Sequence, residues 1–236
     1  MLPRERMKNE ATLNLASEIV NPSALQYLLD GKAAKKSGFF QDKIDEIFGN
    51  TDVTTFDWSS GTDNRNWWWQ AQQLLFLRWY TDIRDSVDED TKTRLRIFCK
   101  EALFNWIKKA AKNEDSPLNW HDHASAFRLR HIVEWITILI QDGQIDECLS
   151  AREQQTICAV IFKHLEFLHD KKNYSLHTNH GFDQALVVYT VSLIWNGVDA
   201  FAPYARLAKK RLKDELDFAF TAEGVHKENS PGYQRY

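Results

Sequence analysis

Long amphipathic stretches are the feature that most constrains how this chain can fold. Apolar side chains recur every three to four residues over 64–83, 91–112, 124–141, 151–169, 181–195 and 202–220. That spacing gathers them on one face of an α-helix, whereas a strand would alternate them between two faces. The 9 glycines and 5 prolines are too few for the many turns of an all-β domain. The sequence therefore predicts an all-α protein.

Short polar segments join these predicted helices, which indicates antiparallel helical hairpins, as in an α-solenoid or an α/α toroid, rather than a four-helix bundle. Segment 181–195 is apolar on most faces and is expected to be an inner helix. Asp146 and Ser150 are candidate N-caps, and Pro203 suits the first turn of the last helix.

The chain divides by regularity into an irregular N-terminal lead-in, 1–60, and a helical domain, 61–236. The cysteines Cys99, Cys148 and Cys158 fall in helical patterns without metal-type pairing, which predicts reduced thiols.

Charge and hydropathy restrict the partners. With 30 basic and 33 acidic residues, the chain lacks the basic excess that general nucleic-acid binding requires. Apolar runs fall short of the ~18–20 residues of a membrane span. The N-terminal segment MLPRERMKNEATLNLASEIV lacks the apolar centre of a signal peptide. We therefore expect neither nucleic acid nor membrane as partner and a cytoplasmic location, with a periplasmic or secreted one left open.

Tryptophan is abundant, with nine residues. Most are expected in the core, but consecutive helical residues point about 100° apart, so the run 67–69 cannot be wholly buried. At least one indole should face a cleft, where it can stack on a sugar ring. Trp68 is the candidate for this contact.

Polar residues crowd the start of predicted helix 181–195, where the chain reads HTNHGFD. Asn179 is placed as an N-cap, and His180 and Asp183 lie three residues apart on one helical face. The helix start supplies free N–H groups and partial positive charge. These residues fit two interpretations. In the first, Asn179 caps a buried helix, Asp183 balances its dipole and His180 fills space. In the second, they form a functional site.

A second polar segment, TAEGVHKENSPGYQRY, follows the last predicted helix and has no apolar period. Its Ser-Pro-Gly turn precedes Tyr233, a pattern typical of a site loop, although a frayed terminus would look similar.

Together, TNHGFDQA and EGVHKENSPGYQRY resemble the heparinase II/III-type polysaccharide lyases, including related alginate lyases. FDW, NWWWQAQQLLFL and NWHDHASAFRLR also resemble upstream segments of that family, so the likeness covers roughly residue 45 to the end. It implies an α/α toroid followed by a β-sandwich domain. Because the sequence stops at Tyr236, we expect an incomplete toroid without the sandwich, and little or no turnover by residues 1–236 alone.

The resemblance also implies β-elimination on a uronic-acid polysaccharide or oligosaccharide, without a cofactor. Asn179 and His180 match the positions that neutralise the substrate carboxylate as charge develops on it. Tyr233 matches the acid–base tyrosine. A phenol with a pKa of ~10 serves more readily as the acid than as the base, and a dual role stays open. Gln234 stands where many relatives have His, which leaves Tyr236 as a second candidate tyrosine.

The segment NWHDHASAFRLR offers further candidates. His121 and His123 suggest a metal, but on a helix their rings would point about 200° apart, so we expect no metal site. Instead, Trp120 and His121 would line a cleft entrance, and Arg128 would pair with a substrate carboxylate or form a structural salt bridge. The expected substrate-binding set is Trp68, Trp120, His121, His123, Arg128, Asp183, Glu228 and Tyr236. In some relatives the residue at the position of Asp183 orients the catalytic His.

Two other functions remain open from the sequence. The chain could be a non-catalytic α/α-toroid protein that binds carbohydrate or assists polysaccharide assembly. Alternatively, it could be a helical interaction scaffold, in which His180 would be buried and unreactive.

Overall fold

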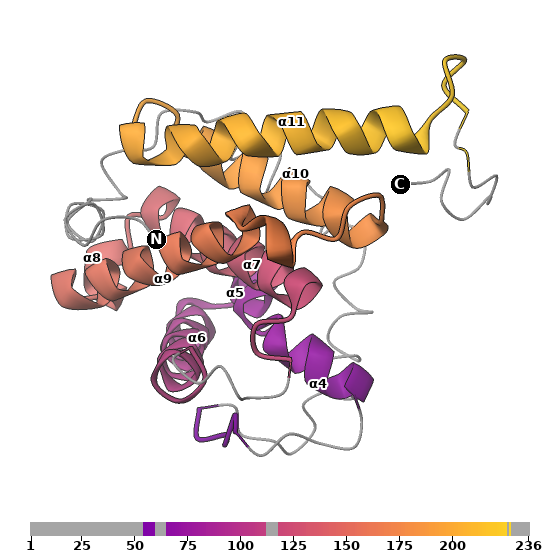
Figure 1. The fold of residues 1–236 in the computed structure, drawn as a ribbon. Coiled ribbons are helices and arrows are strands. Elements are labelled where there is room, and N and C mark those ends of the chain that lie inside the picture. The colour runs from indigo at the N-terminus through magenta and orange to yellow at the C-terminus, as the bar shows by residue number, and fades with distance from the viewer. Residues whose placement is uncertain (1–53, 60–64, 112–117, 226, 228–236) are drawn as a thin grey trace.

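The computed structural model describes residues 54–59, 65–111, 118–225 and 227 (Figure 1). Short 3-10 turns, η2 (Arg84–Ser86), η3 (Lys171–Asn173) and η4 (Asp199–Phe201), separate some of the helices. These residues contain helices and no sheet, which confirms the expected all-α class for this part of the chain. The α-helices are α4 (Arg65–Gln72), α5 (Leu77–Ile83), α6 (Glu89–Lys109), α7 (Asp122–Gln141), α8 (Ile145–Cys148), α9 (Ala151–His169), α10 (Asn179–Ile194) and α11 (Ala202–Ala219).

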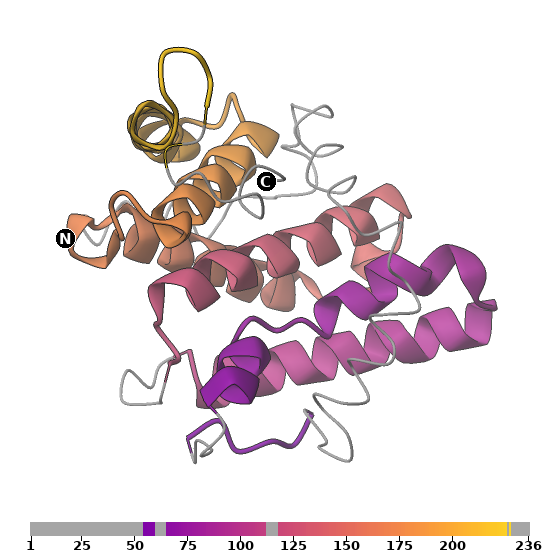
Figure 2. The ribbon, with the colours of Figure 1, turned by 90° about the vertical axis from the view of Figure 1, so that its right-hand side faces the viewer.

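Helix α7 is the centre of the packing, and most of its residues are buried. It contacts α10 on one side and α4 and α5 on the other, with α9 alongside. Figures 1 and 2 show α11 lying along α10 at one edge of the molecule and α6 at the opposite edge. The inner position expected for segment 181–195 is confirmed, because α10 packs between α7 and α11.

One predicted helix is divided in two. The periodicity of 64–83 predicts a continuous helix, but α4 ends at Gln72 and α5 begins at Leu77. Between them Leu74 has a left-handed backbone with φ 54°, while its side chain is fully buried. The break frees main-chain carbonyls, which must find donors elsewhere. Arg128 donates to the carbonyl of Gln72 and His131 to that of Gln73, so distant side chains satisfy the break.

The helix ends test three other predictions. Ser150 caps α9 in a full capping box with Glu153, as predicted. Pro203 lies in the first turn of α11, also as predicted. Asp146 is not a cap, because α8 already begins at Ile145 and Gln144 occupies the cap position.

Tryptophans form much of the core, and Trp58, Trp106, Trp135 and Trp195 are fully buried. The three cysteines are free thiols, of which Cys99 and Cys158 are buried and Cys148 is half-buried. Among the described helices, none combines the length and hydropathy that crossing a bilayer requires. The expected boundary between 1–60 and 61–236 falls outside the described residues.

Candidate functional site

The starts of α7 and α10 meet and bring three histidine rings together. The imidazoles of His123, from α7, and His180, from α10, stack with centroids 4.0 Å apart and planes inclined by 23°. The ring of His121, just before α7, lies 5.8 Å from that of His180. Residues from separate stretches of the sequence therefore share one cluster, and both helix starts direct partial positive charge towards it.

The start of α10 is set by local backbone chemistry. Thr178, not Asn179, caps the helix, and its hydroxyl accepts the Gly181 N–H at 3.1 Å. Asn179 is therefore the first helical residue, and it is exposed. A side chain on Gly181 would collide with the main-chain carbonyl of Ser175, so the preceding loop can approach only a glycine.

A buried carboxylate on α11 holds that loop in place. Glu215 is 3% exposed and accepts hydrogen bonds from the Tyr174 hydroxyl at 2.6 Å and the His177 N–H at 2.9 Å. Burial, and next the bond to Glu215, raises the pKa of Tyr174 above its usual value. His177 adopts φ 60°, and its ring stacks on Phe218 at 3.9 Å. Helix α11 thus positions the loop that leads into the site.

Asp122 is the hub of the cluster. Its carboxylate lies 3.0 Å from His121 Nδ1 and 3.3 Å from His180 Nδ1, and it also accepts from the Ser175 hydroxyl. Burial alone would raise the pKa of Asp122, but hydrogen bonds from His121, Ser175 and the His123 N–H outweigh burial and hold it well below its usual range. Asp122 is therefore an ionised acceptor at neutral pH.

The same His121 nitrogen also lies 3.5 Å from the Ala124 N–H, in the position of an N-cap acceptor. One nitrogen cannot both donate to Asp122 and accept from Ala124. The shorter contact, to an ionised carboxylate, is the stronger of the two. His121 is therefore a weak cap, and its Nδ1 proton belongs to the bond with Asp122.

Asp183 contacts a different histidine from the one expected. Its carboxylate lies 2.7 Å from His123 Nε2, on α7, rather than orienting His180 on its own helix. The close approach of α7 explains the difference, because it places Asp122 beside the His180 ring. Trp69 and Phe127 border His123, with centroids 5.5 and 4.7 Å from its ring.

Arg128 is not a cleft residue, and neither interpretation from the sequence describes it. Its side chain is fully buried and donates to the carbonyls of Gln72 and Asn119, the Ser125 hydroxyl and His164 Nε2. None of these described partners is a carboxylate, so Arg128 does not form the predicted salt bridge with them. Because its side chain is fully buried, it is also not placed to contact a substrate. The reason is that carbonyls released at the α4–α5 break and in the turn before α7 need a donor in the core.

Both tryptophans in the expected substrate-binding set pack against other aromatic rings of the protein. Trp68 is 1% exposed and packs against Phe56 and Trp58, so its assignment to substrate is wrong. Trp120 is half-buried and packs on α9, with ring centroids 4.9 Å from His164 and 5.1 Å from Phe167. Trp69, from the same tryptophan run, borders the histidine cluster.

Other predicted residues differ in accessibility or lie outside the described part. Asn179 is exposed and the His180 side chain is 36% exposed, so both can meet a ligand. Tyr233, Glu228 and Tyr236 lie outside the described residues. Two residues missed by the sequence reasoning, Asp122 as the hub and Ser175 as its donor, complete the cluster. The sequence His-Asp-His was a signal for the first of them.

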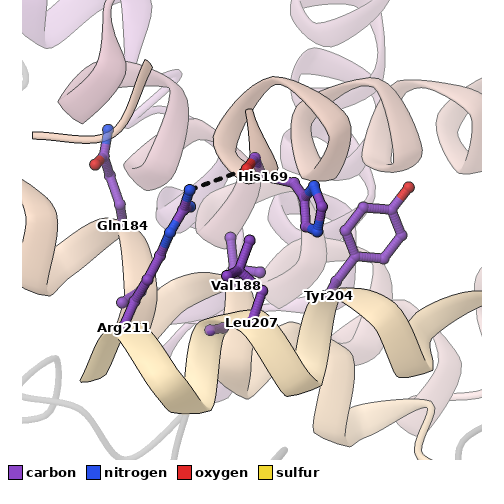
Figure 3. A pocket seen from close by; sticks show the side chains of 8 residues that line it. His169, Gln184, Val188, Tyr204, Leu207 and Arg211 are labelled. Atoms are coloured by element: carbon purple, nitrogen blue, oxygen red, sulfur yellow. Dashed lines mark hydrogen bonds between the residues drawn. The ribbon is translucent and has the colours of Figure 1, made fainter. Parts of the chain in front are cut away.

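Neither of two surface hollows in the described structure is lined by these histidines. One lies between α9, α10 and α11, and Figure 3 shows Arg211 across it, bonded to the His169 carbonyl. It has no room for a water molecule. The other, of about 310 Å³, is lined by residues of α6 and α8, including Arg96 and Lys100. In the described part of the chain, no three His, Cys, Asp or Glu side chains are arranged to hold a metal ion.

Comparison with models of known families, with curated proteins and with solved structures finds no match for this chain. Its function therefore has to be argued from the site itself.

Proposed function

We propose that this chain carries the carboxylate-binding part of a polysaccharide lyase site, in a helical domain of the α/α-toroid type. The observation that carries the proposal is the accessible pair Asn179 and His180, at the positive end of α10 and beside a second imidazole, His121. An amide, imidazoles and helix N–H groups are the donors that a sugar carboxylate needs.

The chemistry of β-elimination explains why such donors would be useful. A base removes the proton at C5 of the uronate, and the electron pair delocalises onto the adjacent carboxylate. The C4–O bond then breaks, C4 and C5 become doubly bonded, and an acid protonates the leaving oxygen. Donors fixed beside the carboxylate stabilise the charge as it develops. In this proposal Asn179 and His180 supply those donors, and Tyr233 supplies the acid.

Binding tests the first part of the proposal. Uronate oligosaccharides of the heparin and alginate types are compared by calorimetry with the same oligosaccharides after reduction of their carboxyl groups. We expect the uronate forms to bind more tightly. Asn179→Ala and His180→Gln should each lower that affinity roughly ten- to a hundredfold, the value of a hydrogen bond to a charged group. Asn196→Ala, an exposed asparagine beyond the other end of α10, is the matched control.

Equal affinity for the uronate and reduced oligosaccharides would refute carboxylate recognition. Because residues 1–236 alone are expected to give little or no turnover, the elimination step is read separately in a form of the protein that carries the β-sandwich domain. It is followed as ultraviolet absorbance of the unsaturated uronate, with Tyr233→Phe as the variant expected to abolish it. Uronate binding that survives in Tyr233→Phe, with no unsaturated product from that form with or without the substitution, would favour the non-catalytic carbohydrate-binding alternative.

A further inference from the structure

Two histidine–aspartate pairs cross between α7 and α10 in opposite directions. His123 of α7 pairs with Asp183 of α10 at 2.7 Å, while His180 of α10 pairs with Asp122 of α7 at 3.3 Å. The two rings stack between the carboxylates. The ring atoms differ: His123 uses Nε2, whereas His180 uses Nδ1.

We propose that Asp122 is the positioning residue of His180, which fixes the imidazole tautomer with the proton on Nδ1 and leaves Nε2 free for a ligand. A carboxylate can only accept, so the nitrogen that faces it must carry a proton. Asp183 fixes the opposite tautomer of His123 in the same way, through Nε2.

The contacts of Asp122 hold its carboxylate in place, so that it accepts a hydrogen bond from His180 and cannot donate one. The carboxylate is held from three sides, by His121, by the Ser175 hydroxyl and by the His123 N–H, so it cannot turn away from His180. Its low pKa keeps it ionised and therefore acceptor-only.

Among the described residues, the titratable groups around the His180 ring come from α7 with its N-cap and from α10. His121, Asp122 and His123 face it from α7, and Asp183 reaches it only through the stacked ring of His123. Among them Asp122 makes the hydrogen-bond contact with a nitrogen of His180. With Nδ1–H bound to Asp122, Nε2 accepts a proton or hydrogen bond in the neutral ring and donates to a carboxylate only when the ring is protonated on both nitrogens. That use of Nε2 rests on the proposed function, whereas the tautomer of the neutral ring does not.

The tautomer can be measured on the unmodified chain. Long-range ¹H–¹⁵N correlation spectra at about pH 9, where an imidazole is neutral, separate the protonated from the unprotonated ring nitrogen. We expect His180 to carry its proton on Nδ1 and His123 to carry it on Nε2. His180→Gln identifies the signals of His180. A neutral His180 with its proton on Nε2 would overturn the proposal without any variant of Asp122.

A crossed pair of variants then tests which carboxylate acts on which ring. An asparagine at position 122 can turn its NH₂ group towards His180, so Asp122→Asn should shift the His180 proton to Nε2 and leave His123 unchanged. Asp183→Asn, the matched control, should change the nitrogen signals of His123 and leave the His180 proton on Nδ1. The reverse assignment, or no change at His180 in a folded Asp122→Asn variant, would refute the proposal.

Uronate binding in the same variants separates the two proposals. If the tautomer is as predicted but no form of the chain distinguishes uronate from reduced oligosaccharide, the proposed function fails and the role of Asp122 in fixing the ring stands. If uronate binding depends on His180 but its proton lies on Nε2, the function stands and the positioning role fails.

Discussion

Replacing Arg128 by lysine tests whether this residue belongs to the core rather than to a substrate cleft. The guanidinium donates to the Gln72 carbonyl at 2.5 Å, the Asn119 carbonyl at 2.6 Å, His164 Nε2 at 2.8 Å and the Ser125 hydroxyl at 3.0 Å. It also lies over the Trp106 ring, 4.4 Å from the centroid. These acceptors come from α4, the turn before α7, α7 itself and α9. A single ammonium group cannot span them.

The cost follows from this geometry. A lysine at this position would keep one or two of the four bonds and leave the other acceptors buried without a donor, at about 1–3 kcal/mol each. Burial already lowers the pKa of Arg128 to about 9. A lysine begins from a lower pKa than arginine and would lose its charge more readily under the same burial. We expect Arg128→Lys to lower the free energy of unfolding by about 3–5 kcal/mol, the combined cost of two or three buried acceptors left without a donor.

Urea unfolding followed by tryptophan fluorescence measures this change. Arg94→Lys is the matched control, because Arg94 is on the exposed surface of α6 and its side-chain bonds to Asp90 and Thr91 are solvent-exposed. The loss of free energy of unfolding in Arg94→Lys should therefore stay within about 0.5 kcal/mol. A loss below about 1 kcal/mol for Arg128→Lys would refute the assignment to the core. A selective loss of uronate affinity in a fully stable variant would return Arg128 to the substrate site.

Three further outcomes follow from single sites. Gly181→Ala should lower the free energy of unfolding by about 1–3 kcal/mol, because the new Cβ meets the Ser175 carbonyl. A higher melting temperature in this variant would contradict the steric argument. Burial, and next the charge of a neighbouring arginine, lowers the pKa of His131 and His164 in the folded protein. As the pH falls, the unfolded chain therefore takes up protons on these histidines before the folded protein does. Stability should fall below about pH 6.5 by up to ~1.4 kcal/mol per pH unit for each, and a urea midpoint constant from pH 7 to 5 would contradict this. Ser150→Ala should lower the free energy of urea unfolding by about 1 kcal/mol, because it removes the capping box of α9. An unchanged free energy of unfolding would contradict this role of the cap.

Periodicity located the helices well because their apolar faces are local properties of the sequence. Segment 151–169 coincides with α9 (Ala151–His169). The break after Gln72 was not predictable in this way, because the donors that satisfy its carbonyls, Arg128 and His131, are more than fifty residues away. Helix propensity and spacing carry no information about such a partner.

The burial of Arg128 could have been predicted from its position in the sequence. It stands four residues after Ala124 and four before Ile132, so it lies on the same helical face as two fully buried residues. A charged residue in the middle of an apolar face must be paired inside the core, unless that face lines a cleft. Burial was therefore at least as strong a prediction as substrate contact.

The pairing of His180 with Asp122 depends on how α7 and α10 pack, which neither motif determines. Within α10 the nearest carboxylate in sequence is Asp183, three residues on, and local spacing alone favours it. The structure instead gives each helix one imidazole and one carboxylate that serve the other helix. A displacement of either helix by one turn would break both pairs at once. The orientation of His180 is thus a consequence of helix packing, and α10 by itself could not hold the ring in place.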